Sequence, residues 1–428
     1  MAIPALLAGI AEPLLSITDT AFVGNIAHHA TEALAAVGIA GSFLSALIWI
    51  LAQSRSAISA IIARYYGAKN LQHISNMPAQ IIAINVGLSL VLYLGTVFFI
   101  EGIFKLYNAS GLVLEYAVSY YKIRAVGLPF TLFVFSVFGI FRGLQNTFWP
   151  MIISLTGLLL NVALDYILIY GIPHVITPLH VNGAAYASLI AQMVMAVMAV
   201  YLLYAKTDIK LRFSLPFHHE IRHILFLSAN LFIRAVSLNV AIYFANSYAT
   251  AYGNNYIAAH TIAFQIWLFF SFFIDGYASV GNIVSGRLLG ERDYKNLWQL
   301  SKNLSRFGIV IALILLVVCF VFYYPIGVLF TKNREILEIF YSIFWIVLLM
   351  QPLNALAFVF DGLFKGLAEA VILRNTLLVA TFLGFVPILW LCDYFGLKIY
   401  GIWIAFIIWM FLRTIILVLA FKRKYLVK

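Results

Sequence analysis

Twelve long apolar segments constrain the fold of this chain more than any other feature. Each contains about 20 residues or more, the length that an α-helix needs to cross the ~30 Å hydrocarbon core of a bilayer. Of the 428 residues, 64% are hydrophobic and only 10% are charged, which is more apolar surface than a soluble chain could bury. We therefore predict an all-α polytopic membrane protein with segments at 3–26, 34–63, 78–104, 117–141, 150–172, 183–205, 221–249, 257–286, 306–330, 337–364, 373–395 and 399–421.

An internal repeat relates the two halves of the chain. Residues 63–70 resemble residues 286–293, and residues 129–144 resemble residues 352–367, in both cases at an offset of 223 positions. Shared ungapped blocks at one offset indicate that helices 1–6 were duplicated as helices 7–12. Because six is even, both halves insert the same way up, as in transporters with parallel repeats. We predict an N-terminal lobe over 1–205, a linker over 206–220 and a C-terminal lobe over 221–428.

The positions of Lys and Arg predict the orientation in the membrane. With the N-terminus inside, 18 of the 27 basic residues lie on inner connections, six lie on the outer side and three lie within segments. This bias follows the rule that basic loops remain in the cytoplasm, so both termini are expected there, in the cell inner (plasma) membrane. The net charge of +11 therefore reflects topology and does not indicate a nucleic-acid partner.

The first segment carries two carboxylates, Glu12 and Asp19. They are seven residues apart, which places them on one helix face about 10 Å apart, and Pro13 favours a bend beside the first. A charge in hydrocarbon costs at least ~2.5 kcal/mol, so such residues usually face an interior cavity. We interpret the segment as a bent helix, a possible switch, that binds cations or protons through Asp19. The alternative for Glu12 is a helix end from which it reaches lipid headgroups.

The fifth segment adds an amide and a third acid. Asn161 and Asp165 share one helix face through their i, i+4 spacing. Together with Asp19 they offer oxygen ligands, which suit hard cations, and a buried carboxyl group also holds a proton readily. The alternatives are an interhelical hydrogen bond for Asn161 and a purely structural role for Asp165.

The C-terminal half has different charged residues within its segments. Arg234, Asp275 and Asp361 have no like residue at their repeat partners, so the lobes have diverged in polar content. An arginine in the membrane needs a counter-charge, and we predict that Arg234 pairs with Asp275, Asp361 or both. The alternative is a structural ion pair that locks the lobe.

Other chemistry is not indicated. His218, His219 and His223 have no zinc-site spacing with a cysteine, and we expect them to be solvated, with no metal site. The chain has no Gly-rich phosphate-binding motif followed by Lys-Ser or Lys-Thr, so ATP is not the expected fuel. We predict no enzyme activity and no cofactor apart from H⁺ or Na⁺ as coupling ion.

These features together resemble the MATE family of multidrug and toxic compound extrusion transporters, in particular its DinF-like branch. The resemblance covers essentially the whole chain. It is carried by Asp19–Gly24, Gly139–Asn146, Asn161–Gly171, Asp275–Ala278 with Gly286–Gly290, and Asp361–Gly362. It implies a two-lobe antiporter whose N-lobe cation site contains Asp19, Asn161 and Asp165. A helix 6 hydroxyl often completes this site, and Ser188 is the nearest match.

The resulting hypothesis is a secondary active antiporter. It would export cationic or amphipathic small molecules by alternating access in exchange for protons, or for sodium, as a monomer in the lipid bilayer. The alternative is a flippase for a lipid-linked saccharide, against which the twelve segments and the carboxylates of the N-lobe argue. A channel is disfavoured because the sequence contains no filter-like motif.

Overall fold

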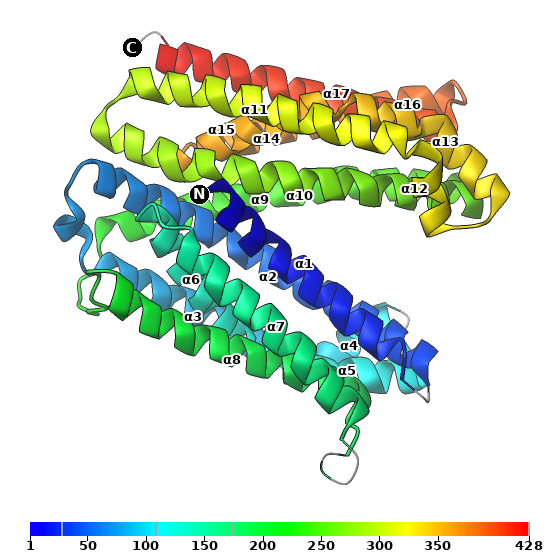
Figure 1. Ribbon diagram of the computed structural model, residues 1–428, viewed down its shortest axis with the longest axis horizontal. Coiled ribbons are helices and arrows are strands. Elements are labelled where there is room, and N and C mark those ends of the chain that lie inside the picture. The colour runs from blue at the N-terminus through cyan, green and yellow to red at the C-terminus, as the bar shows by residue number, and fades with distance from the viewer. Residues whose placement is uncertain (27–28, 108, 173–174, 176, 427–428) are drawn as a thin grey trace. The chain divides into compact units, whose positions relative to one another are not determined.

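The computed structural model describes the chain apart from residues 27–28, 108, 173–174, 176 and 427–428, and apart from the side chains of 10–13, 15–17, 20 and 50. The described residues form helices and connections. Figure 1 shows the long helices running roughly alongside one another within each half of the chain. The predicted all-α class is therefore confirmed.

The first half contains α1 to α8, and the second half begins within α9. The bounds are α1 Ala2–Val23, α2 Ala30–Gly67, the short 3₁₀ helix η1 Leu71–Ile74, α3 Met77–Val97, α4 Ile100–Leu106, α5 Gly111–Ala125, α6 Leu128–Gly143, α7 Phe148–Tyr170 and α8 His180–Lys206. There follow α9 His219–Tyr252, α10 Asn254–Glu291, α11 Tyr294–Val321, α12 Tyr323–Phe330, α13 Arg334–Leu349, α14 Gln351–Gly366, α15 Ala370–Val379, the π-helical turn η2 Ala380–Phe385, α16 Val386–Tyr394, α17 Lys398–Phe421 and the π-helical turn η3 Lys422–Leu426.

Several predicted segments are broken helices. In the described part, nine helices are long and apolar enough to span a membrane, and two bent pairs raise the number to eleven. The helices α5 and α6 meet at 46°, and α13 and α14 meet at 49°. Both second helices carry a proline near their first turn, Pro129 and Pro352, and proline removes a backbone donor and favours a kink. With α1 in the first predicted segment, the helices account for all twelve segments.

The duplication is visible in the backbone. The bounds of α6 and α14 differ by the same 223 positions as the sequence blocks. Two left-handed residues repeat as well: Lys69 (φ 54°) corresponds to Arg292 (φ 57°), and Gln145 (φ 64°) corresponds to Ala368 (φ 60°). Conformations with positive φ are uncommon outside glycine. Their recurrence at one offset shows that both halves share helix ends as well as helix lengths.

The repeated glycines of α6 and α14 allow close helix packing. A Cβ atom on Gly139 would lie 2.8 Å from the carbonyl oxygen of Arg55 on α2. On Gly362 it would lie 2.2 Å from the carbonyl oxygen of Ala278 on α10. Small residues let backbones approach in membrane proteins, so the motif blocks at 139–144 and 362–367 are packing sites for the long helices.

This packing makes a testable prediction. Gly362→Ala should lower stability by about 1–3 kcal/mol, since the added methyl group meets backbone that cannot rotate away. Gly87→Ala is the matched control, because a Cβ atom at Gly87 of α3 meets nothing within 4 Å. The control should gain up to ~1 kcal/mol from helix propensity. Unfolding of the purified variants measures both, and equal stability of the two would contradict the packing role.

The chain forms two compact units. The first comprises Ile3–Tyr65 and Lys69–Leu225, together with Met1. The second comprises Phe226–Lys428, together with Ala2 and Tyr66–Ala68. Helix α8 ends at Lys206, and the irregular segment from 207 to 218 leads to α9 within the first unit. The sites below each lie within one unit.

Candidate functional site

A buried polar cluster in the first unit brings together the four N-lobe residues that sequence analysis singled out. Asp19 comes from α1, Asn161 and Asp165 come from α7, and Ser188 comes from α8. Asp19 is 3% exposed and the other three are fully buried. Helices α7 and α8 pack closely along their lengths, which places Ser188 opposite the polar face of α7.

Hydrogen bonds connect these side chains directly. The hydroxyl of Ser188 donates to Asp19 Oδ2 at 2.9 Å. The amide orientation of Asn161 that suits its neighbours has Nδ2 donating to Asp19 Oδ1 and to Asp165 Oδ2, each at 3.2 Å. The opposite orientation would direct the amide oxygen at two acceptors, so we adopt the first. Asn161 therefore bridges the two acids.

The two acids also interact with each other. The carboxyl groups of Asp19 and Asp165 lie within hydrogen-bonding reach. Among the described residues, Asp165 Oδ1 has no hydrogen-bond partner. Two negative charges so close together repel strongly, and a buried acceptor without a partner is costly. A proton, a bound cation or a nearby basic side chain would therefore stabilise the pair.

Sequence analysis missed two members of this site, Tyr120 and Arg124 of α5. The Tyr120 hydroxyl donates to Asp19 Oδ2 at 3.4 Å, and Arg124 lies near enough to attract the Asp19 carboxylate. Arg124 is one of the six basic residues that sequence analysis places on the outer side. Its i, i+4 spacing from Tyr120 could have indicated a shared face. Their position makes α5 a fourth wall of the site.

A small cavity lies beside this cluster in the first unit. It has a volume of about 70 Å³, and its lining includes Arg55, Arg124, Gln192 and Ser154. Pockets for organic ligands typically measure ~300–1,000 Å³, so this cavity suits water and small ions better than a drug-sized molecule. Arg55 also lies over the ring of Phe135, with 5.2 Å between its guanidinium carbon and the ring centroid.

The second unit contains a separate buried charge cluster. Arg234 on α9 forms an ion pair with Asp361 on α14, as predicted. Arg413 on α17 also approaches Asp361 Oδ2, at 3.5 Å. Its guanidinium group is 1% exposed and lies 4.9 Å from the centroid of Trp409. Two arginines therefore share one carboxylate, and sequence analysis had not assigned Arg413 to this cluster.

Asp275 does not form an ion pair with Arg234, so Asp361 is the one of the two candidate partners that the structure supports. Its carboxylate lies 4.0 Å from Lys365 Nζ, and its side chain is 56% exposed. It acts on Arg234 only through longer-range electrostatic attraction. The physical reason is position: Asp275 remains accessible on α10, whereas Asp361 is buried between α9 and α17.

The predicted switch residues Glu12 and Pro13 have side chains outside the described part of the structure. The backbone there is helical within α1. Their role therefore remains a prediction.

Comparison with known proteins places these sites in a family. The MatE family model matches residues 4–167 and 231–390, which is most of the chain. The chain belongs to the MatE family. The two matched ranges contain all of the buried acids described above, Asp19 and Asp165 in the first and Asp361 in the second.

Relatives of this MatE protein occur in plants and bacteria. It is 28% identical over 430 residues to Protein DETOXIFICATION 44, chloroplastic, of Arabidopsis thaliana, which covers 97% of the chain and 80% of that relative. It is 25% identical over 433 residues to DNA damage-inducible protein F of Escherichia coli K12, covering 99% and 91% respectively. The resemblance to the DinF-like branch is thus confirmed.

Solved structures share the fold. One is described as the outward-facing conformation of a multidrug resistance MATE family transporter of the MOP superfamily. Its TM-score is 0.89 at 24% identity, covering 100% of this chain and 95% of that one. As a member of the MatE family, this chain is a multi-pass membrane transporter for small molecules and is not an enzyme.

Proposed function

We propose that this MatE protein is a secondary active antiporter that exports cationic or amphipathic small molecules in exchange for protons. The observation that supports the coupling site is the buried cluster of Asp19, Asn161, Asp165 and Ser188. Its acids contact each other and repel when both are charged, so a bound proton would stabilise the pair, while the surrounding helices exclude bulk water. Binding of the coupling ion would therefore change both the charge and the packing of α1, α7 and α8.

A proton fits the described geometry better than sodium. Asn161 already donates to both carboxyl groups and Ser188 donates to Asp19, so several carboxylate oxygens already accept hydrogen bonds. A proton shared by two acids needs no further ligands, whereas a metal cation needs several oxygens arranged around it. Sodium remains the alternative coupling ion, since carboxylate, amide and hydroxyl oxygens are all present.

The expected setting is the cell inner membrane with both termini in the cytoplasm. The bias of Lys and Arg toward one set of connections supports this orientation. We expect the protein to act as a monomer, since each lobe buries its own polar cluster within one chain.

Transport in sealed vesicles tests the proposal. We expect efflux of an organic cation from proteoliposomes under an imposed pH gradient and little efflux under a sodium gradient of the same size. Efflux driven by sodium alone would overturn proton coupling. Movement of a lipid-linked saccharide without either gradient would favour the flippase.

The bend at Pro13 is a second expectation of this mechanism. Proline leaves the carbonyl of Gly9 without its helical partner, so two shapes of α1 should be close in energy. Pro13→Ala should leave ion binding at Asp19 nearly intact and slow transport. Spin-label distances across α1 at low and high pH would measure the change, and an unchanged helix would contradict a switch at this position.

A further inference from the structure

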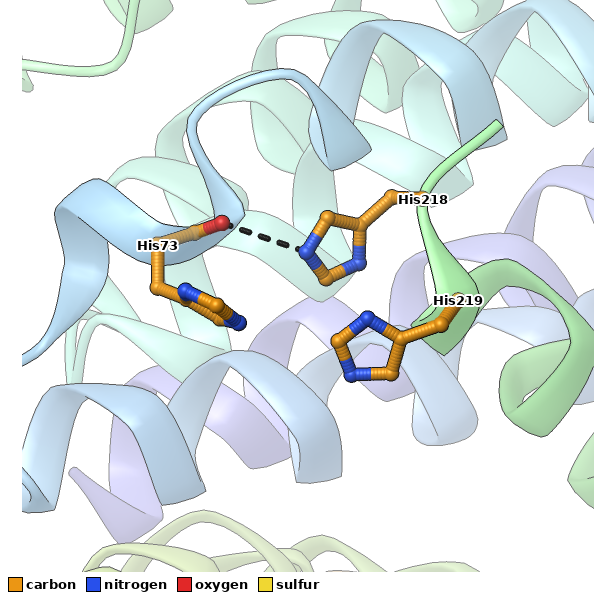
Figure 2. A group of neighbouring side chains, drawn as sticks. All are labelled: His73, His218 and His219. Carbon is orange, nitrogen blue, oxygen red and sulfur yellow. Dashed lines mark hydrogen bonds between the residues drawn. The ribbon is translucent and has the colours of Figure 1, made fainter. Parts of the chain in front are cut away.

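Three histidines of the first unit meet at the end of the inter-lobe linker. His73 comes from η1, the turn between α2 and α3, whereas His218 ends the linker and His219 begins α9. One ligand atom from each lies within 4.8 Å of the others. Figure 2 shows the three imidazole rings converging from these two segments. The expected exposure to solvent is confirmed for His219, whose side chain is 65% exposed, whereas the contact of His73 with the linker histidines was not predicted.

The two segments are held together by buried contacts that do not involve the rings. Gln80 of α3 is fully buried, and its amide donates to the carbonyls of Ser214 at 2.6 Å and Pro216 at 3.2 Å. Its oxygen accepts the backbone N–H of His218 at 2.9 Å. The backbone positions of the histidines are thus fixed by the fold, as a preorganised ligand site requires.

Existing hydrogen bonds indicate which nitrogen of His218 is available. His218 Nε2 lies 3.1 Å from the carbonyl oxygen of His73, so Nε2 carries the proton and donates. Nδ1 then holds the lone pair, and among the described residues it accepts a single 3.2 Å contact, from the N–H of Glu220. That N–H lies in the first turn of α9, where water can replace the acceptor. Metal-bound histidines typically donate their other N–H to a carbonyl, as His218 does here.

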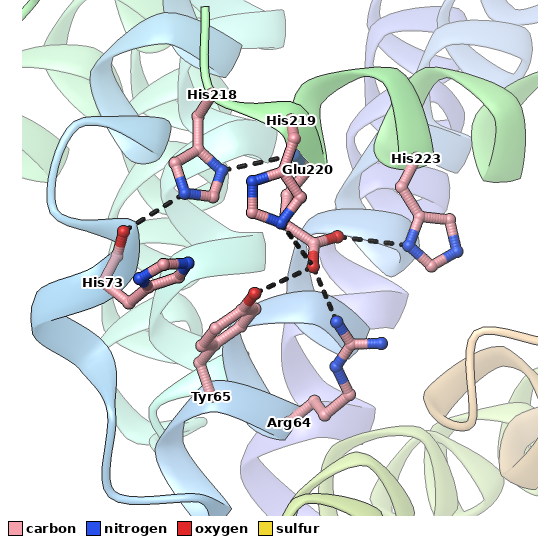
Figure 3. Close-up of polar contacts among 7 residues, drawn as sticks. All are labelled: Arg64, Tyr65, His73, His218, His219, Glu220 and His223. Atoms are coloured by element: carbon pink, nitrogen blue, oxygen red, sulfur yellow. Dashed lines mark hydrogen bonds and ion pairs between the residues drawn. The ribbon is translucent and has the colours of Figure 1, made fainter.

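Glu220 also lies near His219. Its Oε1 is 3.6 Å from His219 Nε2, a charge contact too long for a hydrogen bond, and Nδ1 of that ring has no part in this contact. Glu220 is 4% exposed. Its carboxylate is fixed by hydrogen bonds with Arg64 at 2.6 Å, with the Tyr65 hydroxyl at 2.9 Å and with His223 at 3.1 Å. Figure 3 shows these side chains around Glu220, next to the histidine group.

We propose that His73, His218 and His219 bind one transition-metal ion of the zinc class. Three imidazole nitrogens and one open position make the ligand set of a tetrahedral Zn²⁺ site with bound water. Tetrahedral ligands at 2.0–2.1 Å from zinc lie about 3.3 Å apart, so rotation of the exposed His73 and His219 side chains closes the remaining gap. All three ligands are neutral, which favours Zn²⁺, Co²⁺ and Ni²⁺ over Mg²⁺ or Ca²⁺.

The site would tie the linker to the α2–α3 turn. Residues of both segments line one cleft of about 540 Å³, including Leu71, Pro78, Asp208 and Arg212. A bound ion would add a crosslink between His73 and the start of α9 at the edge of this cleft. Metal occupancy would therefore stabilise the docked linker, by mass action on the folded state.

Cobalt binding tests the proposal on the full-length protein without a polyhistidine tag. We expect one Co²⁺ per chain with the intense visible absorption of tetrahedral coordination, displaced by Zn²⁺. His73→Gln and His219→Gln should each weaken binding more than ~100-fold, since even loss of outer-shell partners costs 10–100-fold. His29→Gln is the control, because it removes an exposed imidazole of the first unit that contacts Glu32 and belongs neither to the trio nor to the contacts of Glu220, and it should bind nearly as the unmodified chain does.

Other outcomes would overturn the site. These are a weak octahedral spectrum, equal affinity in His73→Gln and the unmodified chain, or an equal loss in His29→Gln. Circular dichroism of each variant shows whether a loss of binding reflects unfolding. The readout does not depend on transport, so the result is independent of the antiport mechanism.

Discussion

Asp19→Asn should abolish gradient-driven efflux while leaving the protein folded and inserted. Asn has nearly the same shape as Asp, and it can still accept from Ser188, which donates to Oδ2 in the present structure. It cannot take up a proton near neutral pH, and the repulsion between the two acids disappears. Coupling is lost because the site no longer differs between its ion-loaded and empty forms.

The size of this effect follows from the driving force. Net movement of one charge across 100 mV supplies ~2.3 kcal/mol, which corresponds to roughly 50-fold accumulation against a gradient. In vesicles that contain Asp19→Asn, substrate accumulation should fall to the level seen in vesicles without protein. Substrate accumulation in proteoliposomes measures it.

The matched control removes a carboxylate elsewhere in the same unit. Asp208 lies exposed on the linker, so Asp208→Asn changes the net charge by the same amount without affecting the buried cluster. It should transport normally. Near-normal driven transport in Asp19→Asn would refute the coupling site, and a similar loss in both variants would point to a general charge effect.

The sequence predicted the fold well because a bilayer allows few solutions. Apolar length, the bias of basic residues and the 223-residue offset all act through helix geometry and insertion, and each leaves a simple pattern. The breaks at the start of α6 and α14 were less visible. A proline marks each break, but the 46° and 49° angles depend on packing against neighbouring helices.

The sites show where such reasoning stops. Asp19, Asn161, Asp165 and Ser188 stood out because polar groups in apolar segments are rare, and the structure brings them together. Tyr120 and Arg124 belong to a helix with a less apolar sequence, where the same residue types are ordinary. His73 could not be linked to His218 and His219, since 145 positions separate His73 from His218 and the contact depends on how the linker docks.

Asp361→Asn should destabilise the second unit more than loss of either arginine beside it. The substitution leaves Arg234 and Arg413 buried without their shared carboxylate, and breaking a buried pair typically costs about 3–5 kcal/mol. Arg234→Met should cost less, because Arg413 still lies 3.5 Å from Asp361 and retains the counter-charge. Denaturant titration of each purified variant in detergent measures these free energies of unfolding.

A double-mutant cycle separates the ion pair from general damage. Arg234→Met combined with Asp361→Asn should recover part of the sum of the single losses, since one of the stranded cations has been removed along with the acid. Asp275→Asn serves as the control, because its carboxylate is 56% exposed and its pair with Lys365 is long, at 4.0 Å. Exposed pairs contribute at most ~1 kcal/mol, so this variant should remain close to the unmodified protein. Strictly additive losses from Arg234 and Asp361 would show that the two side chains stabilise the lobe independently, and the shared carboxylate would then not explain why two arginines are buried there.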